Sequence, residues 1–212
     1  MSAAPHGLPD ALPAGERLLW QGRPDWRALA RHAFGVVKLA AYFAVLVTWL
    51  TVSSVRNGAT PGEIGAAVLQ GVALSAVPLG LVVAYAWAVA RSTAYTITDR
   101  RVVLRVGLAL PITVNLPFSR ITAADLNRRG DGSGDIALTL EGTGHLPYLA
   151  LWPHARPWRL ARPQPMLRGL AGVQPVVQIL ARALAASAEM AVPVVPAALP
   201  AKLPVPQAPI AA

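Results

Sequence analysis

The sequence contains no cysteine among its 212 residues. This absence excludes disulfide bonds, thiolate metal ligands and cysteine nucleophiles. Only ten residues are acidic, which leaves few carboxylates for a paired general acid and base. The four histidines are scattered without metal-ligand spacing: His6, His32, His145 and His154. We therefore expect a protein that is not an enzyme and that has no catalytic residues, metal site or cofactor.

Charged residues are also scarce, at 14% of the chain, whereas 54% of the residues are hydrophobic and the mean hydropathy is +0.46. This composition is typical of a chain that lies partly in lipid. The formal net charge of +9 fits the anionic cytoplasmic face of a membrane. Nucleic acid is not an expected partner, because the strand segments offer no aromatic stacking platform. The N-terminus has no basic segment followed by an apolar run, so we expect no cleaved signal peptide.

Two long apolar runs stand in the first half of the chain, at residues 36–55 and 64–90. Each is about as long as a transmembrane helix, and Lys38 is the only charge inside them. The short turn between them predicts a transmembrane helical hairpin over residues 36–90. The alternative is a buried helix pair of a soluble protein.

Basic residues flank the hairpin unevenly. Only Arg56 lies in the turn, whereas both outer ends are rich in arginine: Arg17, Arg23, Arg27, Arg31 and Lys38 on one side, and Arg91, Arg100, Arg101 and Arg105 on the other. Because positive charge accumulates in cytoplasmic loops, both termini are predicted to be cytoplasmic.

Small residues recur at every fourth position of the second run, in two stripes separated by Pro78. Small residues at this spacing allow helices to approach closely. The stripes either pack on the first run of the same chain or pack on helices of a partner. They consist of Ala67, Gly71 and Ser75, and of Gly80, Ala84 and Ala88.

The pattern changes after Arg91 to short segments in which apolar and polar residues alternate. Strands are predicted at 94–107, with Asp99 and Arg100 at the bend, and at 112–126, 135–142 and 145–152; an amphipathic helix follows at 173–188. Residues 91–190 are thus expected to form a cytoplasmic antiparallel β-barrel or sandwich closed by a C-terminal helix. The fold class is an α+β membrane protein.

The remaining segments complete the expected organisation. Residues 1–23 form an N-terminal cytoplasmic segment, and residues 24–35 form an interfacial helix with Trp26, Leu29, Ala30 and Ala33 on its apolar side. The last segment, 191–212, is rich in proline and alanine and is predicted to be disordered.

Residues 151–170 hold four arginines, two tryptophans and four prolines, with no acidic residue. We expect residues 151–156 to end the last strand and residues 157–170 to cross the domain in extended form. The segment is either a rigid connector or a docking surface, since tryptophan and arginine are common interface anchors. The candidate docking residues are Trp152, Arg156, Trp158, Arg159 and Arg162.

Two motifs carry a resemblance to a known family: GERLLWQGRPDW at 15–26 and AYTITDRRVVLRVG at 94–107. Both resemble segments of bacterial membrane proteins with a pleckstrin-homology-like (PH-like) domain. Over residues 8–185 the sequence is similar to the PuhB-type photosynthetic-complex assembly proteins of phototrophic bacteria, and HARPWRLARPQPMLR at 154–168 is the most specific part.

The resemblance implies a non-enzymatic assembly factor or accessory subunit of the photosynthetic reaction centre and its core antenna, in the bacterial inner (intracytoplasmic) membrane. The implied partners are reaction-centre and core light-harvesting subunits, membrane lipids and a second copy of the chain. Two alternatives remain. One is a lipid-sensing module without a photosynthetic partner, and the other is a bacteriochlorophyll-delivery protein with His32 and His154 as candidate ligands.

Overall fold

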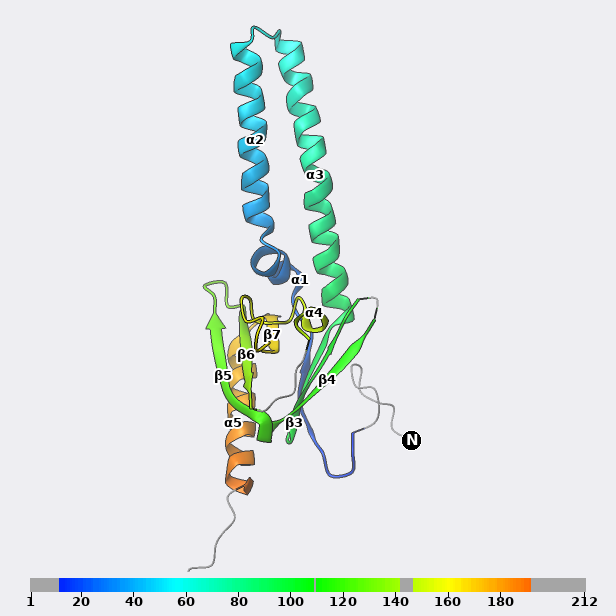
Figure 1. Ribbon diagram of the computed structural model, residues 1–212, viewed down its shortest axis with the longest axis vertical. Coiled ribbons are helices and arrows are strands. Elements are labelled where there is room, and N and C mark those ends of the chain that lie inside the picture. The colour runs from blue at the N-terminus through cyan, green and yellow to red at the C-terminus, as the bar shows by residue number, and fades with distance from the viewer. Residues whose placement is uncertain (1–11, 109, 142–146, 192–212) are drawn as a thin grey trace, which may run out of the picture.

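The computed structural model describes residues 12–108, 110–141 and 147–191. The expected tail at 192–212, together with His6 and His145, lies outside these ranges. A long helical hairpin projects from one end of a domain that contains the strands (Figure 1).

The hairpin consists of α2 (Val36–Arg56) and α3 (Pro61–Ser92), close to the predicted runs but with a longer second helix. Gly35 adopts a left-handed conformation (φ +66°) that turns the chain into α2. At the start of α3, the Thr60 side chain and Glu63 cap each other's backbone N–H groups, and Pro61 follows at the first helical position. Both helices are long and apolar enough to span a membrane.

A short helix precedes the hairpin, as predicted: α1 (Trp26–Ala28) continues into the π-helical segment η1 (Leu29–Ala33). The Asp25 carboxylate accepts a hydrogen bond from the Arg27 backbone N–H at 3.0 Å and so caps α1. The buried side chains of Leu29 and Ala30 pack with Ala86 and Val89 of α3. The apolar side of this helix therefore contacts the base of α3.

In the part of the chain that the structure describes, seven strands form two antiparallel sheets. The first sheet has the order β1 (Leu18–Gly22), β2 (Ala94–Thr98), β3 (Arg101–Val106) and β4 (Ile112–Pro117). The second has the order β5 (Ile121–Arg128), β6 (Gly134–Leu140) and β7 (Met166–Leu170), and the short 3-10 helix η2 (Phe118–Arg120) connects the two sheets. Within the described residues the sheets are not joined into a closed barrel, so of the two predicted alternatives, barrel or sandwich, the closed barrel is wrong.

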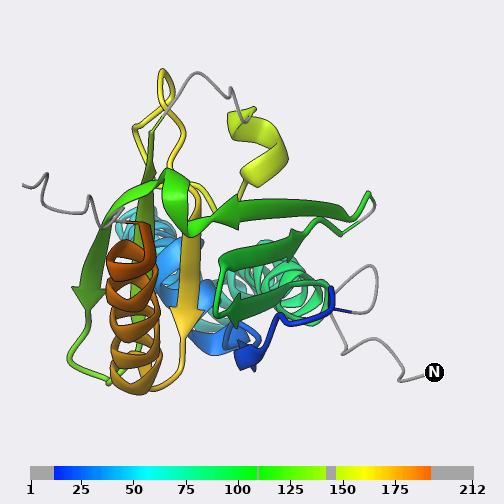
Figure 2. The same ribbon diagram turned by 90° about the horizontal axis from the view of Figure 1, so that it is seen from below.

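One apolar core lies between the sheets and α5 (Val173–Ala191), which lies along the domain on the side seen in Figure 2. The helix face that the sequence predicts is the buried one, with Val173, Val176 and Leu180 in the core. Full burial of a leucine or isoleucine side chain stabilises the fold by about 1.5–3 kcal/mol. The largest core side chains from the strands include Tyr95, Ile97, Leu104, Leu138 and Leu167.

Three of the differences between the structure and the sequence prediction concern strands. Strands β1 and β7 were not predicted, since each has only five residues and neither shows regular alternation of burial. The predicted strand at 145–152 is wrong in its described part, where Tyr148–Leu151 form the single helical turn α4. Four residues are too few to distinguish the helical period from strand alternation.

Candidate docking surface

The apolar side chains of the hairpin point outward. Trp49 on α2 and Leu69 on α3 are each 71% exposed, and no residue of α2 is buried. The hydroxyls of Thr48, Thr51 and Ser54 donate to the carbonyl oxygens four residues earlier, at 2.8–3.0 Å. These polar groups are therefore satisfied within the helix, which is the condition for placing it in an apolar environment.

The two small-residue stripes of α3 lie on different surfaces. Ala67, Gly71 and Ser75 are half-buried, and a Cβ atom added at Gly71 would lie 3.2 Å from Val47 of α2. The first stripe therefore packs inside the hairpin. In the second stripe, Gly80 and Ala84 are exposed and Ala88 is half-buried, and a Cβ at Gly80 would meet nothing within 4 Å. The second stripe is the one left open to a partner.

Trp152 lies at the base of the hairpin. Its ring stacks on Tyr85 of α3, with 5.9 Å between ring centroids, and meets Phe34 edge-on at 6.0 Å. This predicted docking residue thus joins the domain to the hairpin, although almost half of its surface remains exposed.

His154 lies next to this aromatic cluster and is fully buried. Its Nε2 is 3.0 Å from the Thr93 hydroxyl, and its Nδ1 is 2.6 Å from the Tyr95 hydroxyl. Burial, followed by the nearby Arg168 charge, lowers the pKa of His154 to about 3. The imidazole is therefore neutral, and each ring nitrogen has a hydroxyl partner.

A buried ion pair continues these polar contacts into the second sheet. We call His154, its two hydroxyl partners and this ion pair the polar joint. Asp135 is 3% exposed and pairs with both terminal nitrogens of Arg129. The same carboxylate accepts a hydrogen bond at 2.8 Å from the backbone N–H of Gly169, whose carbonyl accepts one at 2.7 Å from the N–H of Asp25. Asp135 thus connects β6 and β7 with the segment that leads into the hairpin.

The β5–β6 turn makes a second contact with that segment. The Asp131 carboxylate lies 3.2 Å from His32 Nε2 and accepts bonds from the Ser133 hydroxyl and N–H. The Ser133 hydroxyl, and then His32, lowers the pKa of Asp131 to about 2. The bonds from Ser133 thus place Asp131 within the β5–β6 turn, whereas Asp135 has the separate structural role described above.

Residues 155–165 form a loop that returns on itself. Ala155 and Pro165 form an isolated β-bridge, and the N–H of Arg156 donates to the Gln164 carbonyl at 2.9 Å. The Arg156 guanidinium binds Asp125 at 2.6 Å and the Gln164 side chain at 3.1 Å. The predicted extended crossing at 157–170 is therefore wrong for residues 157–165, which these bonds close into a loop, whereas residues 166–170 are extended as β7. We call residues 157–162 the tryptophan loop.

The tip of the tryptophan loop is open to solvent. Trp158 is 94% exposed and has a left-handed backbone conformation (φ +63°), and Leu160 is 66% exposed. Arg159 and Arg162 are exposed beside them. Of the five predicted docking residues, Trp152 and Arg156 make contacts within the chain, whereas Trp158, Arg159 and Arg162 remain available to a partner.

The two family-like motifs meet in the first sheet. Glu16 of the first motif is almost fully buried and binds Arg101 of the second through two hydrogen bonds of 2.7 and 2.6 Å. Burial acts to raise the pKa of Glu16, but the hydrogen bonds from Arg101 and Thr98 outweigh it, so that this pKa is lowered. The motif residues Glu16 and Arg101 thus have a structural role.

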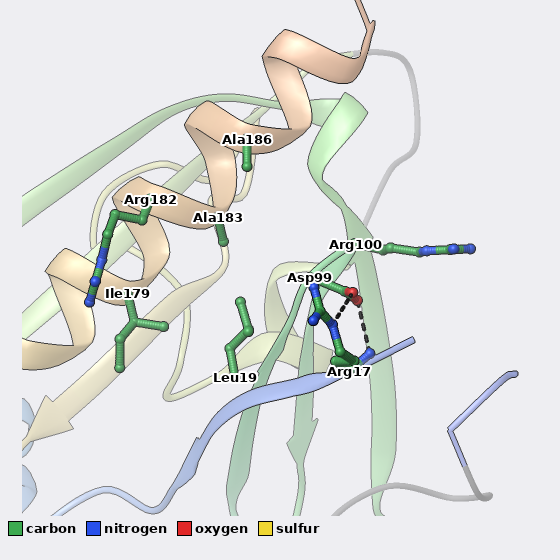
Figure 3. A pocket seen from close by; sticks show the side chains of 8 residues that line it. All are labelled: Arg17, Leu19, Asp99, Arg100, Ile179, Arg182, Ala183 and Ala186. Atoms are coloured by element: carbon green, nitrogen blue, oxygen red, sulfur yellow. Dashed lines mark hydrogen bonds and ion pairs between the residues drawn. The ribbon is translucent and has the colours of Figure 1, made fainter. Parts of the chain in front are cut away.

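A groove of about 510 Å³ opens at the end of the domain away from the hairpin, between β1 and α5 (Figure 3). Its walls include Leu19 and Ile179, and its rim carries Arg17, Arg100 and Arg182. Arg17 is paired with Asp99 at 3.5 Å. Within residues 12–108, 110–141 and 147–191, no group of three or more histidine or acidic residues is placed to hold a metal ion.

Comparison with known proteins identifies the family. Residues 32–162, more than half of the chain, match the bacterial PH domain. The chain belongs to the bacterial PH domain family. It is also 38% identical, over 178 residues, to an uncharacterised 23.7 kDa protein in the puhA 5′ region of Rhodobacter capsulatus, an alignment that covers 84% of this chain and 83% of that relative. No solved structure matches the chain.

Proposed function

We propose that this bacterial PH domain protein is a non-enzymatic assembly factor or accessory subunit of the photosynthetic reaction centre and its core antenna. The observation that carries the proposal is the 38% identity to the relative in the puhA 5′ region of Rhodobacter capsulatus. The resemblance to the PuhB-type assembly proteins points in the same direction.

In this proposal the hairpin spans the bacterial inner membrane, with the domain and both termini in the cytoplasm. The outward-facing apolar side chains of α2 and α3 support membrane insertion, because the described part of the domain does not cover them. The arginines near the base of the hairpin, against Arg56 alone in the far turn, support the orientation.

Contact with the photosynthetic subunits involves two surfaces. The outer stripe of α3 packs on a transmembrane helix of a reaction-centre or antenna subunit, because Gly80 and Ala84 let a second backbone approach closely. The tryptophan loop docks on cytoplasmic parts of the same subunits. Its exposed Trp158 supplies a rigid apolar anchor, and Arg159 supplies hydrogen-bond donors.

Pigment delivery is the weaker alternative. A metal-ligating imidazole needs a free ring nitrogen, whereas both nitrogens of the buried His154 face hydroxyl partners. The Nε2 atom of His32 is engaged with Asp131 at 3.2 Å. Buried His154 is therefore not poised to bind the central magnesium of a bacteriochlorophyll, and His32 would have to bind it through Nδ1.

The proposal is tested by complementation in a phototrophic host that lacks its own copy of the gene. The wild-type chain is expected to restore the near-infrared absorption of the reaction centre, whereas Trp158→Ala combined with Arg159→Ala restores it only in part. Equal yields with the wild type and this double variant would contradict docking through the tryptophan loop.

A matched control removes an exposed apolar and an exposed basic side chain from another surface, through Leu126→Ala with Arg128→Ala on β5. This control is expected to support the wild-type yield. Immunoblots of the membranes establish that all variants accumulate to the same level.

A further inference from the structure

A second pocket, of about 340 Å³, lies at the base of the hairpin, where α3 meets the first sheet. Three arginines from different parts of the chain surround it: Arg23 follows β1, Arg91 ends α3, and Arg105 lies on β3. The lining also includes Ser92, Leu108 and Pro111, and it contains no acidic residue. We call this site the basal arginine pocket.

Among the described residues, the three arginines have no counter-charge. None of them forms an ion pair with any residue in the described ranges, whereas Arg17, Arg101, Arg129 and Arg156 each have a carboxylate partner. Like charges that line one pocket repel each other, and the repulsion falls when an anion occupies the space between them. The arrangement therefore favours an anionic ligand.

The guanidinium of Arg91 is held in a defined position. It lies over the Trp87 ring, 4.4 Å from the ring centroid. Stacking uses the flat face of the guanidinium and leaves its edge N–H groups free to donate to phosphate oxygens. Arg91 can thus bind a phosphate group without losing this contact.

Exposed apolar side chains lie in the turn that forms part of the pocket lining. Leu108 and Leu110, in the turn between β3 and β4, are 51% and 80% exposed. This turn lies at the same end of the domain as the base of α3 (Figure 1). Exposed leucines beside a cationic pocket match a lipid molecule, whose phosphate is charged and whose chains are apolar.

We propose that the basal arginine pocket binds the phosphate headgroup of an anionic phospholipid, of the phosphatidylglycerol class, from the cytoplasmic leaflet. The lipid phosphate lies between Arg23, Arg91 and Arg105, and its acyl chains run along α3 past Leu108. This inference rests on the proposed insertion and orientation of the hairpin but not on its photosynthetic partner. Its consequence is that a bound lipid fixes the domain against the membrane surface.

The test titrates short-chain phosphatidylglycerol into the full-length protein in a neutral detergent, with phosphatidylcholine as the reference lipid, and measures bound lipid by native mass spectrometry. Each arginine is expected to contribute about fivefold in affinity. Replacement of all three, by Arg23→Gln, Arg91→Gln and Arg105→Gln, is therefore expected to lower the phosphatidylglycerol affinity roughly a hundredfold.

The groove in Figure 3 supplies a control with the same loss of charge: Arg17→Gln, Arg100→Gln and Arg182→Gln. This variant is expected to retain the wild-type affinity. Since Arg105 is half-buried, the double variant Arg23→Gln with Arg91→Gln tests the site without altering β3, with an expected loss of roughly 25-fold.

Equal losses of phosphatidylglycerol affinity in the basal and control variants would mean that only the net charge matters, and would overturn the proposed site. Equal binding of phosphatidylcholine and phosphatidylglycerol by the wild type would overturn the headgroup assignment. Failure of the photosynthetic proposal is measured separately, because reaction-centre yield in the complemented host does not enter the titration.

Discussion

The hairpin and the domain differ in the exposure of their apolar side chains. In the domain, residues such as Leu104 and Leu138 are fully buried among strands and α5. In the hairpin, residues such as Val45 and Leu74 are about two-thirds exposed. Within the described residues, the domain thus covers its own apolar side chains, whereas the hairpin leaves its apolar side chains exposed.

The two regions meet at the polar joint, whose polar groups are buried, and at an aromatic contact that is partly exposed. Buried His154 and Asp135 hold the strands and the loop together, and Trp152 stacks on the base of the hairpin. The contrast teaches that the described part of the domain contacts the hairpin only near its base. These contacts fix where the hairpin begins and leave most of the surface of both helices exposed.

The largest expected effect concerns the polar joint. Asp135→Ala leaves Arg129 without its carboxylate and the Gly169 N–H without an acceptor, so we expect a loss of about 3–5 kcal/mol in unfolding free energy. Asp125→Ala removes the carboxylate partner of Arg156. Because Asp125 is far more exposed than Asp135, this change is expected to cost less than about 1 kcal/mol in unfolding free energy. Denaturant unfolding of the detergent-solubilised protein, followed by circular dichroism, measures both. Similar losses would contradict the distinct role of Asp135.

A lysine introduced in the hairpin tests the opposite environments of the two regions. Val45→Lys places a charge on the outward surface of α2, where insertion is expected to cost about 2.5–3.5 kcal/mol. Leu126→Lys on β5, also at an exposed position, is expected to change stability by less than about 0.5 kcal/mol. The amount of protein recovered in the membrane fraction measures the effect. Equal recovery would indicate that water, and not lipid, surrounds α2.

Acid is expected to weaken the joint through His154. Since the folded-state pKa of about 3 lies below the ordinary value of 6.5, the stabilising effect of the neutral ring is complete above pH 6.5 and declines as the pH falls toward 3. The slope is about 1.4 kcal/mol per pH unit, or roughly 2 kcal/mol between pH 6.5 and 5. Unfolding measured at several pH values is expected to show a shallower slope in His154→Gln. An unchanged slope would assign the acid sensitivity to other groups.

The smallest expected effect is the difference in stability between an alanine substitution in the outer stripe of α3 and one in the inner stripe. Gly80→Ala meets open space and gains helix propensity, so we expect a stabilisation of at most about 1 kcal/mol. Gly71→Ala gains the same propensity but presses on Val47, so its net effect is expected to be lower by a few tenths of a kcal/mol or more. Thermal midpoints in detergent compare the two. The reverse order would mean that the first stripe does not form the contact between α2 and α3.

The sequence predicted those parts of the fold that have a strong period. The apolar runs predicted both hairpin helices, and the buried face of α5 followed from Val173, Val176 and Leu180. The strands from 94 to 140 were recognised by their alternation. Strand β7 is not predicted, because MLRGL shows no such alternation and because its pairing with β6 depends on contacts between residues distant in the sequence.

The sequence identifies the candidate docking residues by their unusual composition, but it does not predict which of them are buried and which are exposed. Residues 151–170 were distinctive in the sequence, yet nothing in them indicated that Trp152 turns inward to Tyr85 while Trp158 remains exposed. The basal arginine pocket does not follow from the sequence, although its arginines belong to the basic residues that predict the orientation of the hairpin. Arg23, Arg91 and Arg105 are far apart in the chain, and only the fold brings them together.

The central claim is tested most directly by what co-purifies with the tagged full-length chain from mild-detergent membranes of a phototrophic host. Quantitative mass spectrometry is expected to show enrichment of reaction-centre and core antenna subunits with the wild type, and a clear loss with Trp158→Ala and Arg159→Ala. The Leu126→Ala and Arg128→Ala control is expected to retain them. A wild-type preparation without enriched photosynthetic subunits would contradict the account.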